Sequence, residues 1–178
     1  WQPRRQRQMC IRDRIYSSTD GQTIKICKRI MSIIGDCKMV SIDEAKNENL
    51  SKYEKVIVGA SIRYGKHKPE LYEYISENCD HLIDINASFF SVNVVARKPE
   101  KNTPLTNPYV QKFLSISQWH PSLIGVFAGK IDYPRYGVLD KFMIRLIMWI
   151  TKGPTDTKNV YEFTNWDDVD SFAKKIST

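Results

Sequence analysis

Histidine, cysteine and glycine are scarce in this sequence, and their spacing fits no metal or nucleotide signature. The four cysteines, Cys10, Cys27, Cys37 and Cys79, form no CxxC pair, and the three histidines are scattered. This spacing argues against a zinc site and a disulfide framework, so we expect reduced thiols and no bound metal. The glycines form neither GxxxxGK[ST] nor GxGxxG, which excludes a P-loop and a dinucleotide fingerprint.

Long apolar runs are also missing from the chain. None approaches the roughly 20 residues that an apolar helix needs to cross a bilayer. The arginine-rich start is not followed by the apolar segment of a signal peptide. We therefore expect neither a transmembrane span nor a signal peptide.

Positive charge exceeds negative charge, with 27 Lys and Arg against 20 Asp and Glu and a formal net charge of +7. Residues 1–14 hold five arginines and one aspartate, so much of the excess lies in one short segment. Outside residues 97–101 we find no basic stripe with interleaved aromatic residues, the pattern expected of a nucleic-acid-binding surface. We expect no nucleic-acid partner.

Strand-like and helix-like patterns alternate along the chain, which favours a parallel sheet covered by helices on both faces. Apolar residues recur at helical spacing in 23–34, 69–82, 107–117 and 165–176. Five strands are expected at about 11–16, 38–42, 56–62, 89–95 and 123–131. Five such strands fit a doubly wound, flavodoxin-like sheet with the strand order 2-1-3-4-5.

The segment SSTDGQT (17–23) stands between the first expected strand and the first helix. The start of a helix offers unpaired N–H groups and a partial positive charge, and hydroxyl side chains add donors, so this loop could bind a phosphate. Gly21 would let the backbone approach an anion. FMN is the obvious ligand in this topology. The alternative is that Ser18, Thr19 or Asp20 only caps the helix.

Small polar residues and an arginine follow two further strands, in ASIRYG (60–65) and SVNVVAR (91–97). Ligands in this fold bind outside the carboxyl ends of the strands, where these segments should meet the 17–23 loop. Ile62 and Tyr64 could form an apolar wall for a flavin ring.

Together ASIRYG, SVNVVARKPEKNTP, the series YPRY–D–FMI–LIM and TDT resemble the menaquinone-dependent protoporphyrinogen oxidases of bacteria. The resemblance runs from about Ile15 to the C-terminus. It implies a flavodoxin-like FMN enzyme of haem biosynthesis that oxidises protoporphyrinogen IX to protoporphyrin IX and passes electrons to menaquinone or ubiquinone. It also implies a peripheral location on the cytoplasmic side of the cell membrane.

By the same resemblance, residues 18–23 would hold the FMN phosphate, and residues 61–65 and 91–93 would line its ribityl chain and ring. Residues 132–158 would be the insertion that splits the fifth strand in long-chain flavodoxins. The implied cofactor-binding residues are Ser18, Thr19, Asp20, Gly21, Gln22, Thr23, Ser61, Ile62, Arg63, Tyr64, Gly65, Ser91, Val92 and Asn93.

The N-terminus departs from that family, whose first strand is apolar. Here RQRQMCIRDR precedes Ile15, and burying such charges unpaired in a central strand is costly. We expect residues 1–14 to be a non-native or disordered tail and residues 15–178 to form one flavodoxin-like domain. A genuine basic tail is the alternative.

The segment VLDKFMIRLIMWITKG (138–153) reads as a helix that is apolar on nearly all sides, with Lys141 and Arg145 as its polar stripe. We expect residues 138–152 to make a peripheral membrane contact, with Ile144 and Met148 on the outer side. A homodimer contact, the wall of a quinone or porphyrin pocket, and a fully buried cover helix are the alternatives.

The expected substrate carries two propionates, so cations near the flavin edge are candidate substrate ligands. They are Arg63, Arg97, Lys98, Lys101 and Arg135, each of which could instead be a solvated surface charge. The catalytic residues stay unassigned because no convincing general base is present. Two alternative functions are a flavodoxin-type electron carrier and a nicotinamide-dependent quinone reductase.

Overall fold

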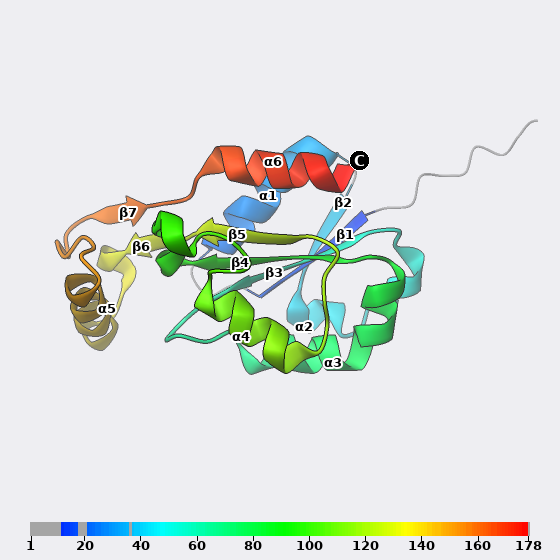
Figure 1. The fold of residues 1–178 in the computed structure, drawn as a ribbon, viewed down its shortest axis with the longest axis horizontal. Helices are drawn as coiled ribbons and strands as arrows, with labels where there is room; N and C mark the ends of the chain where they lie inside the picture. Colours follow the sequence, from blue (N-terminus) through cyan, green and yellow to red (C-terminus); the bar gives the residue numbers. More distant parts are fainter. Residues whose placement is uncertain (1–11, 18–20, 36, 178) are drawn as a thin grey trace, which may run out of the picture.

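The computed structural model describes residues 12–17, 21–35 and 37–177, and a five-stranded parallel sheet forms its centre (Figure 1). Each strand pairs in parallel with its neighbours. The predicted α/β class with a parallel sheet is therefore confirmed. The strands lie in the order β2-β1-β3-β4-β5, with bounds β1 Arg12–Ser17, β2 Cys37–Ser41, β3 Val56–Ser61, β4 Ser88–Asn93 and β5 Ile124–Ala128.

Two parts of the expected organisation fall partly or wholly outside the described residues. These are residues 1–11, most of the expected tail, and Ser18, Thr19 and Asp20 of the phosphate loop. Residues 12–14, also assigned to the tail from the sequence, pair with β2 and β3 as the first half of β1.

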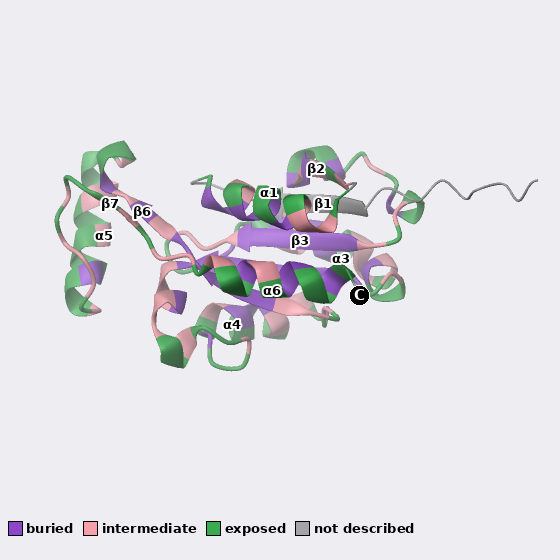
Figure 2. Ribbon diagram, turned by 90° about the horizontal axis from the view of Figure 1, so that it is seen from above, coloured by how far each residue is buried: buried purple, intermediate pink, exposed green. Residues whose placement is uncertain are grey.

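The central strands β3 and β4 are buried on both faces because helices cover the sheet from either side (Figure 1). Figure 2 shows β3 in the colour of buried residues. Phe89 and Phe90 are neighbours on β4, so their side chains point to opposite faces. Phe89 packs in a cluster with residues of α3 (Pro69–Asp84) and α4 (Pro108–Ser117). Phe90 packs in a cluster with residues of α1 (Gln22–Ile34) and α6 (Trp166–Ser177).

Helix α6 forms where its sequence signals predict it. The side chain of Asn165 accepts a hydrogen bond from the backbone N–H of Asp167 at 3.1 Å, and two aspartates stand in the first turn. Its buried residues are Val169, Phe172, Ala173 and Ile176, the apolar face expected from their spacing.

The insertion after β5 carries its own secondary structure and projects from one end of the sheet (Figure 1). Strands β6 (Lys130–Asp132) and β7 (Val160–Glu162) pair antiparallel in a separate two-stranded sheet, and α5 (Val138–Ile150) lies between them in the chain. Thus β7 pairs with β6 instead of completing β5 in the main sheet. The short helices are α2 Ile42–Ala45, η1 Leu50–Lys52, η2 Val94–Arg97, η3 Pro99–Lys101 and η4 Tyr133–Arg135.

None of the helices in the described ranges combines the length and the apolar character needed to cross a membrane.

Candidate functional site

The start of α1 meets the carboxyl ends of β3 and β4 at a pocket, which we call the strand-end pocket. Parallel strands end at one edge of the sheet, so segments that are distant in the sequence converge there. The lining residues are Gln22, Thr23, Ser61, Ile62, Val92, Asn93, Val94, Gly129 and Lys130.

Thr23 contributes a buried hydroxyl group to this pocket. Its side chain is only 1% exposed, and its Oγ1 has no hydrogen-bond partner within the described part of the chain. Buried hydroxyls are normally paired, because an unpaired one loses the hydrogen bonds that it made to water. A ligand that fills the strand-end pocket could supply the missing partner.

The backbone at the start of α1 favours a negatively charged ligand. Gly21 has φ +75°, a left-handed conformation that glycine adopts without steric cost. Its carbonyl accepts from the Lys25 N–H at 3.1 Å, so the helix begins directly after it. The first turn of a helix presents N–H groups without intrahelical partners and a partial positive charge.

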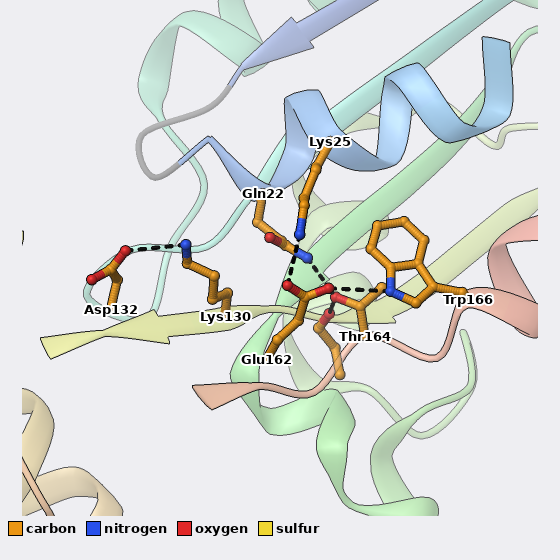
Figure 3. Close-up of polar contacts among 8 residues, drawn as sticks. Gln22, Lys25, Lys130, Asp132, Glu162, Thr164 and Trp166 are labelled. Atoms are coloured by element: carbon orange, nitrogen blue, oxygen red, sulfur yellow. Dashed lines mark hydrogen bonds and ion pairs between the residues drawn. The ribbon is translucent and has the colours of Figure 1, made fainter. Parts of the chain in front are cut away.

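Hydrogen bonds fix the start of α1 against β7 and the segment that follows it (Figure 3). Gln22 Nε2 donates to Thr164 Oγ1 at 2.8 Å, and Thr164 Oγ1 donates to the carbonyl of Ala128 at 2.7 Å. Glu162 on β7 accepts from Lys25 Nζ at 2.8 Å and from the indole of Trp166. The bond from Lys25 lowers the pKa of Glu162.

A second pocket, which we call the helix-covered pocket, lies between the sheet edge and α5. It shares Ile62, Val94 and Lys130 with the strand-end pocket, so the two are adjacent. Its walls are mainly apolar and aromatic, and it also contains the cations Arg63, Arg97 and Lys130. The remaining lining residues are Tyr64, Gly65, Val95, Tyr109, Ile131, Tyr136, Met143, Ile144, Ile147, Met148 and Thr151.

Arg63 and Tyr64 connect the loop after β3 to the first turn of α5. Arg63 Nη2 donates to Asp140 Oδ2 at 2.8 Å, and the Tyr64 hydroxyl donates to Asp140 Oδ1. The Arg63 guanidinium also lies 5.3 Å from the centroid of the Tyr64 ring. Arg63 therefore has a protein carboxylate as a partner, whereas the sequence predicted that it would face a substrate carboxylate.

Arg97 lies at the other end of α5. Its Nη2 donates to the carbonyl of Thr151 at 3.0 Å and to Thr151 Oγ1 at 2.9 Å, and its Nη1 donates to the carbonyl of Val94. Burial lowers the pKa of Arg97. A cation at the carboxyl end of a helix satisfies terminal carbonyls and interacts favourably with the helix dipole.

Helix α5 turns a different face outward from the one expected. Met148 is buried and Ile144 is half-buried, and both pack in one cluster with Ile131 and Tyr133. The expectation that Ile144 and Met148 lie on the outer side is therefore wrong. The exposed large apolar residues of α5 are Val138, Leu139, Phe142, Met143, Leu146, Ile147, Trp149 and Ile150.

Most of the described residues expected at the cofactor lie together. Gln22, Thr23, Ser61, Ile62, Val92 and Asn93 line the strand-end pocket, and Ile62, Arg63, Tyr64 and Gly65 line the helix-covered pocket. A third hollow, which we call the rim hollow, is lined by Gly21, Ile24, Arg63, Asp132, Arg135, Tyr136 and Asp140.

Three expected residues do not line these pockets. Ser91 is fully buried and its Oγ lies 3.1 Å from His67 Nε2, on the other side of the strand. Lys98 and Lys101 stand on the loop after β4 and are absent from the linings of the three pockets named here.

Other lining residues were missed in the sequence. Gly129 and Lys130 follow β5 directly, so the rule used for the ends of β3 and β4 would have found them. Nothing in the sequence indicated that Asp140 would lie at the site, because its partner Arg63 is 77 positions away in the chain.

Behind the strand-end pocket lies a buried polar chain. Asn93 Oδ1 accepts from the Ala96 N–H at 3.0 Å and from Asn107 Nδ2 at 3.1 Å, so Asn93 Nδ2 faces Ser91 Oγ at 3.4 Å. Ser91 Oγ can then donate its proton to His67 Nε2, which requires a neutral imidazole. Burial lowers the pKa of His67 to about 4, which agrees with that state.

Comparisons with known proteins identify relatives along most of the chain. A family described as "Flavodoxin domain" matches residues 15–158. The protoporphyrinogen IX dehydrogenase [quinone] of Escherichia coli (strain K12) is 39% identical over 167 residues, which cover 92% of both chains. The protein of the same name from Leishmania major is 42% identical over 168 residues, which cover 92% of this chain and 73% of that one.

Among solved structures, a flavodoxin from the domain Archaea matches with a TM-score of 0.47 and 14% sequence identity. The match covers 93% of this chain and 94% of that chain.

Proposed function

The chain belongs to the flavodoxin-domain family and, within it, to the protoporphyrinogen IX dehydrogenases, and on that premise we propose that it oxidises protoporphyrinogen IX to protoporphyrin IX with a quinone as electron acceptor. The observation that carries this proposal is the placement of two adjacent pockets. The strand-end pocket is polar at the helix start, and the mainly apolar helix-covered pocket opens beside it.

FMN would bind with its phosphate end at the strand-end pocket. A phosphate would lie at the start of α1, where helix N–H groups and the conformation of Gly21 favour an anion. Thr23 Oγ1, which has no hydrogen-bond partner among the described residues, supplies a hydroxyl within the same pocket. When bound, the flavin would accept the electrons removed from the substrate. The chain would hold it and shape the space beside it.

The helix-covered pocket would take the tetrapyrrole. Its apolar and aromatic walls suit a large, flat, mostly apolar molecule, and its cations suit propionate groups. Of the expected substrate ligands, Arg63 and Arg97 line this pocket and Arg135 lines the adjoining rim hollow. Arg97 would act chiefly by holding α5, and Lys98 has no place in the proposal.

Helix α5 would bring the enzyme to the membrane that contains the quinone. Phe142 and Trp149 are 64% and 72% exposed, and both lie on the face that turns away from the helix-covered pocket. An interfacial helix buries such a face at the acyl boundary, while cations such as Arg145 attract anionic head groups. We place the protein on the cytoplasmic side of the membrane. The insertion would correspond to the one that long-chain flavodoxins carry. A homodimer through this face is the competing arrangement.

Turnover assays separate this function from its two alternatives. FMN-loaded protein is incubated without oxygen, either with protoporphyrinogen IX or with NADH or NADPH, and in each case with and without a menaquinone analogue. Porphyrin fluorescence that depends on the quinone supports the dehydrogenase. Quinone reduction by the nicotinamide alone would indicate a quinone reductase, and turnover of neither substrate would favour an electron carrier.

A further inference from the structure

Asp140 occupies a site that is built to hold a carboxylate. One of its oxygens accepts from Arg63 and the other accepts from the Tyr64 hydroxyl, so both oxygens have a donor from the same loop. A guanidinium and a phenol presented side by side form a cradle that any planar carboxylate can use.

The backbone holds this cradle in place independently of Asp140. The N–H of Arg63 donates to the carbonyl of Lys66, and the N–H of Lys66 donates to the carbonyl of Arg63, which closes a tight turn. Tyr64 has φ +50° and Gly65 has φ +74°, as the two central residues of such a turn require. A non-glycine residue in this conformation is costly and is often found at ligand-binding positions.

The cradle lies where a ligand can reach it. Arg63 lines both the helix-covered pocket and the rim hollow, and Asp140 lines the rim hollow. The side chains of Arg63 and Asp140 are 35% and 24% exposed. A partly solvated ion pair contributes little net stability, so one carboxylate can replace another on the same donors at little cost.

The first turn of α5 is less closely packed than the last turn. Val138 and Leu139, which start the helix, are 89% and 75% exposed. At the other end Met148 is buried, and Arg97 binds Thr151. Release of Asp140 would therefore free the start of α5 while its end stays attached.

We propose that Asp140 is an internal stand-in for a substrate carboxylate: it occupies the Arg63–Tyr64 cradle when the helix-covered pocket is empty, and a propionate of the tetrapyrrole displaces it. This inference rests on the proposed function. It goes further by naming the residue that competes with the substrate and the segment that moves. Asp140 thereby lowers the affinity for ligands that carry a carboxylate. It leaves unchanged the affinity for ligands of the same shape that lack that charge.

The test measures porphyrin binding to Asp140→Asn, which keeps the shape of the side chain and removes its charge. The probes are protoporphyrin IX and its dimethyl ester, which has no carboxylates, each titrated into FMN-loaded protein by fluorescence. We expect Asp140→Asn to bind protoporphyrin IX at least threefold more tightly than the wild type and to bind the ester unchanged. Equal or weaker binding of the diacid would overturn the proposal.

Two controls accompany this measurement. Asp168→Asn makes the same charge change in the exposed first turn of α6, and it should leave both affinities unchanged. In an Arg63→Gln background the Asp140→Asn change should no longer affect the binding of the diacid. If Asp140→Asn still tightens binding without Arg63, the competition is not at the cradle and the inference is wrong.

Hydrogen exchange of the wild-type protein gives an independent readout. The backbone N–H of Lys141 donates to the carbonyl of Gly137 at 2.9 Å, so it reports on the first turn of α5. Protoporphyrin IX should accelerate exchange at Lys141 and Phe142, and slower or unchanged exchange contradicts displacement. If the wild type catalyses no quinone-dependent oxidation while Asp140→Asn still tightens the binding of protoporphyrin IX, the proposed function fails and the stand-in role of Asp140 remains supported.

Discussion

Arg97 Nη2 donates to the backbone carbonyl of Thr151 at 3.0 Å, across 54 positions of the sequence. The contact joins the loop after β4 to the carboxyl end of α5. Gly153 lies close by, and a Cβ atom at that position would be only 3.0 Å from Arg97 Nη2. The wall of the helix-covered pocket therefore depends on an arginine that the sequence marked for substrate binding.

Replacing Arg97 with methionine should destabilise the protein, because it removes the donors to Thr151 and Val94 and leaves their half-buried carbonyls without this partner. The expected loss is about 1–3 kcal/mol in the free energy of unfolding, measured by urea denaturation. Arg145→Met, on the exposed side of α5, is the matched control and should change stability by less than about 0.5 kcal/mol. Unchanged stability with a raised KM for the porphyrinogen would instead assign Arg97 to the substrate.

His67 should make the stability of the protein depend on pH between about 6.5 and 4. Its pKa is lowered by burial to about 4, so the unfolded chain takes up a proton before the folded chain does. Stability should therefore fall as the pH falls through this window, by at most about 3 kcal/mol. His67→Gln should remove this part of the pH dependence in urea titrations. His120→Gln, at an exposed site, should retain it.

Thr23→Val separates cofactor binding from folding. The Thr23 hydroxyl has no partner within the described residues, so its loss should leave the stability of the cofactor-free protein equal or slightly higher. If the hydroxyl binds FMN, its loss should weaken FMN affinity about tenfold or more, as followed by flavin fluorescence quenching. Ser32→Ala, at an exposed hydroxyl on α1, is the control. Unchanged FMN affinity in Thr23→Val would remove Thr23 from the cofactor site.

The double substitution Phe142→Glu with Trp149→Glu tests the membrane contact. Both side chains are more than half exposed, so the fold should survive. Liposome binding and turnover with a long-tailed quinone should be lost, whereas turnover with a water-soluble acceptor should persist. Leu105→Glu provides a control, because Leu105 is 85% exposed and lies outside α5. Liposome binding that survives the double substitution would reject this face as the membrane contact.

The sequence predicts a helix best where its residue pattern is compatible with only one orientation against the protein. Helix α6 has an Asn165 cap, acidic residues in its first turn and one apolar face, and all three signals agree with the structure. Helix α5 has almost no polar face, so its spacing does not indicate which side faces the protein. Met148 is buried because of the local shape around Ile131 and Tyr133, which the sequence does not encode at short range.

The same distinction holds for the candidate site, where some residues could be predicted from the sequence and others could not. Residues such as Thr23 and Ser61 could be placed because the ends of parallel strands meet at one edge. The partners of charged side chains could not be placed, because Arg63 reaches Asp140 and Arg97 reaches Thr151 only once the insertion has folded back. Their charge indicated a role at this edge without indicating what they bind.

The most direct test of the account follows the flavin and the porphyrin in one anaerobic experiment. FMN-loaded protein is mixed with excess protoporphyrinogen IX in the absence of any acceptor, and a menaquinone analogue is then added. We predict that the yellow flavin absorbance is lost on mixing, that about two electrons are transferred per bound FMN, and that sustained porphyrin fluorescence appears only after the quinone is added. Flavin that stays oxidised in the presence of protoporphyrinogen IX would contradict the central claim.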